Sequence, residues 1–130
     1  MTYTDYPPRA LLIEDEPAIA SQLLALLIQR GCQVTSLTLG AEGLTSAATS
    51  QPDLLVLNVA LPDMTGAEVV RRIRALEGLE LLPVVFVSSE QYDAAHPDAS
   101  AGVVLKPFLM RDLGAALDFG LQSLTGVEVD

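Results

Sequence analysis

The chain has 130 residues, with 17 acidic against 7 basic side chains and a net charge of -10 at neutral pH; this length suits one domain with a single core. The negative charge repels nucleic-acid backbones and anionic lipid, so we expect neither nucleic acid nor a membrane as a partner. No uncharged apolar run approaches the roughly 18 residues of a membrane span, and the N-terminus lacks a secretion-signal pattern, so we expect a cytoplasmic location.

The expected domain organisation is simple. Residues 1–8 are predicted to be a disordered lead-in, residues 9–125 the domain, and residues 126–130 a short C-terminal tail. The single cysteine, Cys32, cannot form an internal disulfide. Its place at the end of a helical segment suits a small buried apolar residue better than a nucleophile.

Five apolar runs bounded by turn or cap signals are predicted to be strands: residues 10–14, 32–37, 53–58, 83–88 and 101–106. Segments of helical period alternate with them, which favours an α/β protein with a parallel sheet over a sandwich or a barrel. Runs such as LLVL and VVFV are apolar on both faces, as expected where helices cover both faces of the sheet. The prediction is a three-layer αβα fold.

Several helices have recognisable ends in the sequence. The first is expected to begin at Pro17 and to stop at Gly31, with proline early and glycine late. The third is expected to open with a capping box made by Thr65 and Glu68 and to stop at Gly78. Its inward face is predicted to carry Val69, Val70, Ile73 and Leu76.

Three other features concern helical segments. The only basic cluster, Arg71, Arg72 and Arg74, is expected to be a solvated helix face. The fourth helical segment contains Pro97 and is predicted to be short or degenerate. The last helix is predicted to bury a leucine stripe, formed by Leu109, Leu113, Leu117, Leu121 and Leu124.

Polar residues finish the predicted strands. Strand one is followed by Glu14 and Asp15, and strands three, four and five end in Asn58, Ser88 and Lys106. Ligands of open parallel sheets bind beyond the carboxyl ends of the strands, so these side chains are expected to converge. Carboxylates suit hard divalent cations, whereas lysine and a hydroxyl suit phosphoryl oxygens. The pattern therefore predicts a small ion-binding cup.

These residues resemble the receiver domain of two-component response regulators, over about residues 9 to 125. LLIEDE is similar to its strand-one acidic pair, LNVALPDMTG to its phosphoacceptor strand and loop, VVFVSS to its switch-hydroxyl strand, and LKPF to its lysine-proline step. The resemblance implies a flavodoxin-like (βα)5 fold of the CheY type with strand order 2-1-3-4-5. It also implies a role in bacterial two-component or phosphorelay signalling, with a histidine kinase or another regulator as partner.

The resemblance implies a role for each matching position. Glu14 and Asp15 match the metal-binding acids, and Asn58 matches the phosphorylated aspartate. Ser88 matches the switch hydroxyl that turns toward the phosphoryl group. Two further positions complete the set: the ion-pairing lysine matches Lys106, and the switch aromatic ring of many members is replaced by Val103.

Asn58 is the main departure from the family pattern. Its amide oxygen is neutral and delocalised, so it cannot form a stable acyl phosphate, and we expect phosphorylation to fail. The amide nitrogen can donate to Asp15 and relieve carboxylate repulsion, which predicts a pocket locked in one arrangement. A metal site of Asp15, Glu14 and Asn58 has lost one anionic ligand, so the expected cofactor is none or weakly bound Mg²⁺.

The favoured interpretation is a stand-alone, phosphorylation-independent pseudo-receiver that acts through protein–protein contact and is not an enzyme. The second is a conventional response regulator whose acceptor aspartate has been replaced by Asn58. The third is a phosphatase-type enzyme; LIEDEP has acids after the first strand but lacks the spacing that haloacid-dehalogenase phosphatases use.

A partner patch is expected on helices one and five. The apolar residues of the first helix, Leu26 among them, spread more widely than one sheet requires. On the last helix Phe119 falls opposite the leucine stripe and is an expected anchor. The patch would serve another signalling protein or a second copy, giving a homodimer through helices one and five.

Overall fold

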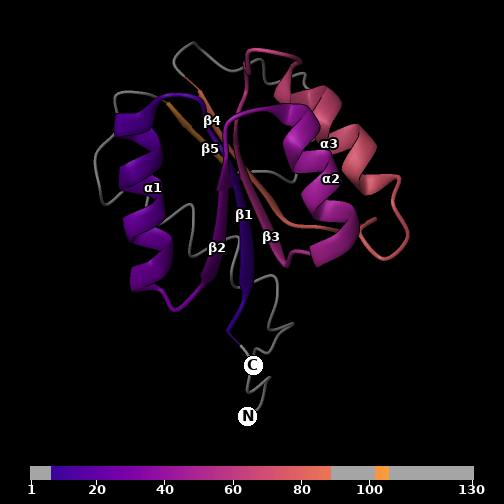
Figure 1. The fold of residues 1–130 in the computed structure, drawn as a ribbon, viewed down its shortest axis with the longest axis horizontal. Coiled ribbons are helices and arrows are strands. Elements are labelled where there is room, and N and C mark those ends of the chain that lie inside the picture. Colours follow the sequence, from indigo (N-terminus) through magenta and orange to yellow (C-terminus); the bar gives the residue numbers. More distant parts are fainter. Residues whose placement is uncertain (1–6, 89–101, 106–130) are drawn as a thin grey trace.

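The fold is taken from a computed structural model, which describes residues 7–87 in full and the backbone alone of residues 88 and 102–105. The strands form one five-stranded parallel sheet in the order β2-β1-β3-β4-β5 (Figure 1). The strands are β1 Arg9–Ile13, β2 Gln33–Leu37, β3 Leu54–Asn58, β4 Val84–Ser88 and β5 Gly102–Leu105. The described helices are α1 Pro17–Gln29, α2 Gly40–Ser50 and α3 Gly66–Arg74.

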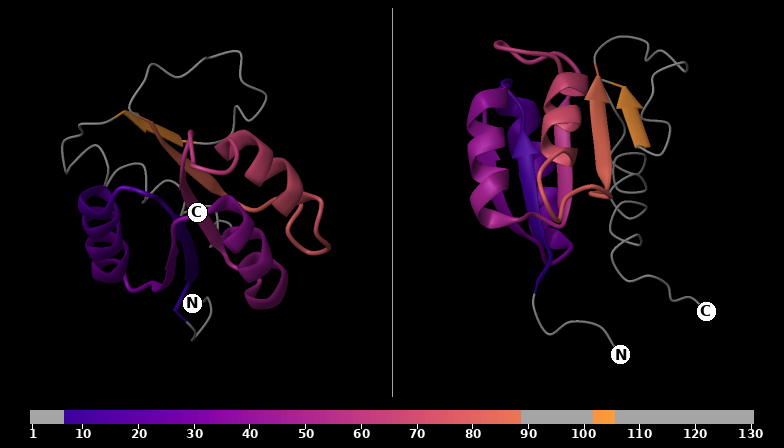
Figure 2. Two further views of the ribbon diagram at one scale, coloured as in Figure 1. Left: turned by 45° about the horizontal axis from the view of Figure 1, so that its top comes forward. Right: turned by 90° about the vertical axis from the view of Figure 1, so that its right-hand side faces the viewer.

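The helices cover both faces of the sheet. Helix α1 lies on one face, and α2 and α3 lie side by side on the other (Figures 1 and 2). Strand β3 is buried along its whole length, as its unbroken apolar run predicts. Alternate residues serve the two faces: Leu12 and Val56 belong to the core under α1, whereas Leu11 and Leu57 belong to the core under α2 and α3. The predicted αβα layers and strand order are confirmed.

The ends of α1 are as predicted. Pro17 occupies the first turn, where its missing N–H needs no partner. The helix ends at Gln29, and Gly31 follows with φ +85, a left-handed conformation that glycine adopts without strain. Cys32 is buried beside this turn, as predicted, and its burial raises the pKa of the thiol.

Helix α3 is shorter than the sequence prediction. It ends at Arg74 rather than at Gly78. Beyond it the backbone tightens, because Ala75 N–H donates to the Arg72 carbonyl and Leu76 N–H to the Ile73 carbonyl, both over three residues. Gly78 lies in the following turn with φ +90. The inward face is confirmed, with three side chains fully or nearly buried and one partly buried: Val69, Val70, Ile73 and Leu76.

Some expectations fall outside the described residues. These are the fourth helical segment, the leucine stripe of the last helix, Lys106, Phe119 and the two chain ends. Within residues 7–88 and 102–105, no helix has the length and apolar character needed to cross a membrane.

Candidate functional site

The parallel register brings the acidic pair beside Asn58. Ile13 pairs with Leu57, so Glu14 stands level with Asn58 at the carboxyl edge of the sheet. Glu14 N–H donates to the Leu37 carbonyl over 3.0 Å, which fixes the chain as it leaves β1. Glu14 is 1% exposed and Asn58 8% exposed, and they are the two buried polar side chains among the described residues. The predicted convergence is seen for the ends of β1 and β3, where the Asn58 amide contacts both Glu14 and Asp15.

The Asn58 amide connects both carboxylates. Its Nδ2 lies 3.2 Å from Glu14 Oε2 and 3.1 Å from Asp15 Oδ1, and it donates to both. Its Oδ1 accepts from Ala60 N–H over 3.1 Å. The two carboxylates can only accept and the Ala60 N–H can only donate, so these partners allow one orientation of the amide. The donation to Asp15 expected from the sequence is present.

Glu14 also supports the start of α1. Its Oε2 accepts from Glu16 N–H over 3.1 Å, at the residue that precedes the helix. One carboxylate oxygen therefore serves the helix start and the Asn58 amide together. Charge-assisted bonds of this kind are stronger than neutral ones. Glu14 therefore supports the helix start and also belongs to the polar cluster of Glu14, Asp15 and Asn58, which we call the Asn58 pocket.

The loop of residues 59–65 leaves the pocket and returns to it. Gly66 N–H donates to the Val59 carbonyl over 2.6 Å, and Ala60 bridges to Thr65 in antiparallel fashion. Gly66 is required by a close approach, since a Cβ there would stand 2.6 Å from the carbonyl oxygen of Asn58. The start of α3 is therefore packed directly against the end of the strand that carries Asn58.

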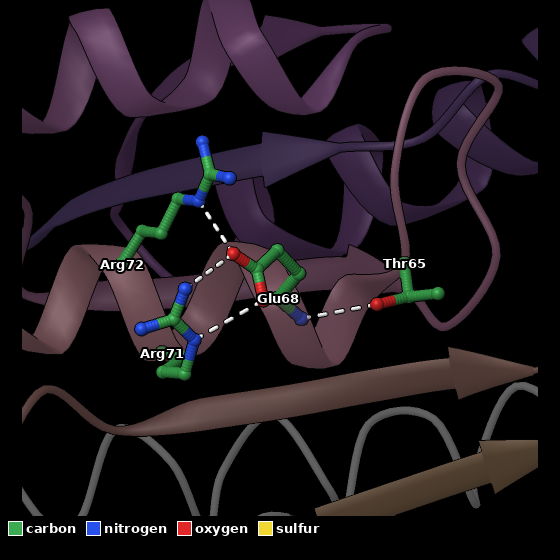
Figure 3. Close-up of polar contacts among 4 residues, drawn as sticks. All are labelled: Thr65, Glu68, Arg71 and Arg72. Atoms are coloured by element: carbon green, nitrogen blue, oxygen red, sulfur yellow. Dashed lines mark hydrogen bonds and ion pairs between the residues drawn. The ribbon is translucent and has the colours of Figure 1, made fainter.

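Thr65 caps α3 as the sequence predicts. Its Oγ1 accepts from Glu68 N–H over 3.1 Å (Figure 3). The Glu68 carboxylate turns instead to Arg71 and Arg72, and both guanidinium groups donate to it (Figure 3). These bonds lower the pKa of Glu68 to about 2, with Arg71 the larger cause and Arg72 the second. The expected solvated face is confirmed for Arg71 and Arg72, which stay exposed while they pair with an acid one helical turn away. Arg74 departs from it, because its guanidinium is partly buried and donates to the Leu82 carbonyl.

Asp63 is a polar residue of the loop that sequence reasoning missed. Its carboxylate accepts from Gly40 N–H over 2.8 Å and from Ala41 N–H over 2.9 Å, at the start of α2. These bonds lower the pKa of Asp63, with Ala41 the larger cause. The sequence signal was an acidic residue in a turn. Nothing in the letters connects it to a helix 22 residues earlier.

The chemistry of the donor set bears on a metal. Among residues 7–88 and 102–105, no three His, Cys, Asp or Glu side chains form a metal-binding group. The Asn58 oxygen faces Ala60 N–H, and the amide nitrogen faces the carboxylates that would hold a cation. As arranged here, Asn58 does not fit the role of a metal ligand.

A family model described as the response regulator receiver domain matches residues 10–118. The chain belongs to this family. Among curated relatives, the KDP operon transcriptional regulatory protein KdpE of Escherichia coli is 35% identical over 113 residues, covering 86% of this chain and 50% of that protein. KdpE of Mycobacterium tuberculosis strain H37Rv is 37% identical over 111 residues, covering 82% of this chain and 48% of that protein. The chain spans about half the length of these relatives.

Solved structures agree with the family. A CheY-like receiver domain protein of Methanospirillum hungatei has a TM-score of 0.79 at 23% identity, covering 91% of this chain and 96% of that one, which shows the flavodoxin-like fold. The receiver domain of the sensor histidine kinase PA1611 of Pseudomonas aeruginosa has a TM-score of 0.72 at 26% identity, covering 92% and 98%; that protein carries a magnesium ion in its active-site cleft.

The remaining receiver positions are placed only in part. Ser88 is the last residue of β4, beyond Val87, which pairs with Asn58. Val103 lies within β5 and pairs with Phe86. Lys106 lies outside the described residues.

The partner patch predicted on the first helix is wrong at Leu26. This side chain is 7% exposed and packs in the core under α1 with Leu23 and Leu27. The apolar residues of α1 cover a wide arc of the helix, and the core beneath the helix buries more of that arc than we expected from the sequence. The exposed large apolar residue of α1 is Ile28, at 57%. Phe119, the other half of the patch, lies outside the described residues.

Proposed function

We propose that this receiver domain works without phosphorylation at residue 58 and acts through protein–protein contact. The observation that carries the proposal is the Asn58 amide, which stands between Glu14 and Asp15 and donates to both. Receiver domains interact with histidine kinases and other signalling proteins, and this chain is expected to do the same with its pocket in one fixed arrangement.

The chemistry of an amide supports this proposal. A phosphoryl group attaches to a nucleophilic oxygen, and the Asn58 Oδ1 is neutral, delocalised and bonded to Ala60 N–H. The nearest anionic oxygens belong to Glu14 and Asp15, which accept from the amide nitrogen. In this proposal residue 58 joins the two strand ends by hydrogen bonds and does not accept a phosphoryl group.

The charge of the pocket supports it as well. An aspartate in this position would place a third carboxylate close to two others, and two unit charges 4 Å apart already repel by about 4 kcal/mol at an effective dielectric near 20. The amide removes this charge and supplies two donors instead. A pocket of this kind needs no cation to hold its shape.

Magnesium is expected to bind weakly or not at all. The cation would compete with the Asn58 nitrogen for Asp15 and Glu14, and the amide would have to rotate to present its oxygen. The PA1611 receiver holds magnesium in its cleft. For this chain we propose an affinity below that of an aspartate variant, because Mg²⁺ prefers carboxylate oxygens.

The setting of this function is proposed from the family. The domain of residues 9–125 would act in the bacterial cytoplasm, on a kinase, another regulator or a second copy of itself, and not as an enzyme. A second function is favoured by the relatives: they are transcriptional regulatory proteins about twice as long, 35% and 37% identical to this chain. A conventional receiver with its acceptor aspartate replaced by Asn58 would share that likeness.

Intact mass spectrometry after incubation with acetyl phosphate and Mg²⁺ tests the proposal. We expect no stable phosphoryl adduct on the native chain and an adduct on Asn58→Asp. An adduct on the native chain overturns phosphorylation independence. A pull-down with a purified histidine kinase then compares the two forms. Capture of the native chain at least equal to that of the phosphorylated variant supports the fixed-pocket function, and capture of the phosphorylated variant alone supports the conventional one.

A further inference from the structure

Helix α2 begins without a cap of its own. The residue at its N-cap is Leu39, whose side chain has no acceptor atom, so the first N–H groups of the helix need partners from elsewhere. Glu42 satisfies one of them locally, since its Oε1 accepts from Leu39 N–H over 3.2 Å. The N–H groups of Gly40 and Ala41 are left for a more distant residue.

That residue is Asp63. Its two carboxylate oxygens take one N–H group each, Gly40 on Oδ1 and Ala41 on Oδ2, across 23 and 22 positions of sequence. A negative charge at a helix N-terminus is stabilised by the helix dipole as well as by the two bonds. The lowered pKa of Asp63 agrees with these contacts.

The loop and the helix are also in direct contact. A Cβ on Gly40 would stand 2.6 Å from Cγ of Met64, so the backbone of the helix start lies against the side chain that follows Asp63. Gly40 is buried. The tip of the loop and the first turn of α2 therefore form one packed unit.

The other end of the same loop is held by the pocket. Asn58 Oδ1 accepts from Ala60 N–H, two residues into the loop, while its Nδ2 holds Glu14 and Asp15. Between Ala60 and Asp63 the loop closes on itself, since Leu61 N–H donates to the Met64 carbonyl over 3.2 Å. The short loop thus links two polar clusters, with few residues between them to absorb a shift.

We propose that Asp63 is a positioning residue that couples the Asn58 pocket to the N-terminus of α2 through the loop of residues 59–65. A change at Asn58 displaces Ala60 and alters the bonds that Asp63 makes to Gly40 and Ala41. By linkage, loss of the Asp63 bonds alters Ala60 and the pocket by the same factor. This coupling does not depend on whether residue 58 is phosphorylated.

A helix cap alone would predict something different. A residue that only caps α2 affects α2 and nothing across the loop. Glu42 provides the matched control, because its carboxylate accepts from Thr38 and Leu39 at the same helix start rather than from residues 59–65. Comparing Asp63→Asn with Glu42→Gln separates a cap from a coupling residue.

The test is amide hydrogen exchange measured by NMR on the full chain. With Asp63→Asn, we expect the exchange rate of Ala60 N–H to rise at least about twofold, the smallest coupling typical of residues in one network. With Glu42→Gln, the rate at Leu39 should rise while that at Ala60 stays unchanged. Val56, in the fully buried strand β3, reports whether either variant has loosened the whole fold.

The reverse experiment starts from the pocket. Asn58→Ala should raise the exchange rates of the Gly40 and Ala41 N–H groups. In the double variant with Asp63→Asn, these rates should be no higher than in Asp63→Asn alone. If Asp63→Asn changes Gly40 and Ala41 alone and leaves Ala60 at its native rate, Asp63 is a local cap and the proposal is overturned. The exchange rate of Ala60 N–H in Asp63→Asn is sufficient to test the proposal, because Asp63 is exposed and its substitution leaves the core intact.

Discussion

Asn58 Nδ2 and Asp15 Oδ1 lie 3.1 Å apart and join the ends of two adjacent strands, 43 residues apart in sequence. The same nitrogen reaches Glu14, so one neutral group holds two acidic side chains that would otherwise repel each other across the pocket. The stability of this edge of the sheet therefore depends on residue 58 having a donor.

The first prediction concerns the charge at residue 58. Asn58→Asp replaces two donated hydrogen bonds by two carboxylate contacts, and we expect the free energy of unfolding without divalent cations to fall by about 1–3 kcal/mol. Urea unfolding with a chelator measures it. Added Mg²⁺ should restore more stability to this variant than to the native chain. A variant as stable as the native chain in chelator would contradict the role given to the amide.

The second prediction concerns the pH dependence of α3. The pKa of Glu68 is lowered from 4.5 to about 2 by Arg71 and then Arg72. A lowered pKa stabilises the fold at pH values above 4.5, and this stabilisation is lost as the pH falls from 4.5 toward 2. NMR titration of the Glu68 carboxyl should give a pKa well below 4.5. Arg71→Gln should raise the pKa of Glu68 more than Arg72→Gln does. A Glu68 pKa near 4.5 in the native chain and in both variants would rule out the ion pairs.

The third prediction concerns the cap of α3. Thr65→Ala removes the acceptor of Glu68 N–H, and such a loss typically destabilises a protein by about 1 kcal/mol. Thr65→Ser keeps the hydroxyl and should stay close to the native chain. The midpoints of urea unfolding compare the three. If alanine and serine behave alike, the hydroxyl does not cap the helix.

The fourth prediction contrasts two glycines. A Cβ on Gly66 would meet the rigid carbonyl oxygen of Asn58 at 2.6 Å, whereas a Cβ on Gly43 would meet the end of the Ile13 side chain at 2.2 Å. A side-chain end can move and a strand carbonyl cannot, so Gly66→Ala should destabilise by about 1–3 kcal/mol and Gly43→Ala by less. Thermal unfolding of both variants tests the order. The reverse order would mean that the β3 end yields more easily than the core beneath α2.

Sequence reasoning succeeds where the type of a residue, apolar or polar, directly indicates whether it lies in the core or at a strand end. Unbroken apolar runs give the buried strands, and the polar residues at their ends give Glu14, Asp15 and Asn58, because parallel strands place their carboxyl ends together. Strand bounds shift by about one residue, as hydrogen bonding rather than apolarity defines them.

Sequence reasoning fails where a side chain bonds to distant backbone groups, where the extent of burial depends on the packed fold, or where several partners compete for one side chain. Asp63 bonds to peptide N–H groups, which every residue carries, so no pattern of side chains points to them. Leu26 looks like surplus on a helical wheel, yet the sheet beneath α1 buries it. Glu68 fits a capping box by spacing, but two arginines offer its carboxylate charged donors instead of the backbone N–H.

The dependence of α2 on Asp63 has a consequence for synthesis on the ribosome. Residues 40–50 leave the exit tunnel before residue 63 does, so the Gly40 and Ala41 N–H groups of the nascent helix emerge bonded only to water. Short helices are marginal in water without tertiary support. We therefore expect the second β-α unit of the nascent chain to reach its full stability only after the strand and loop that follow it have been translated.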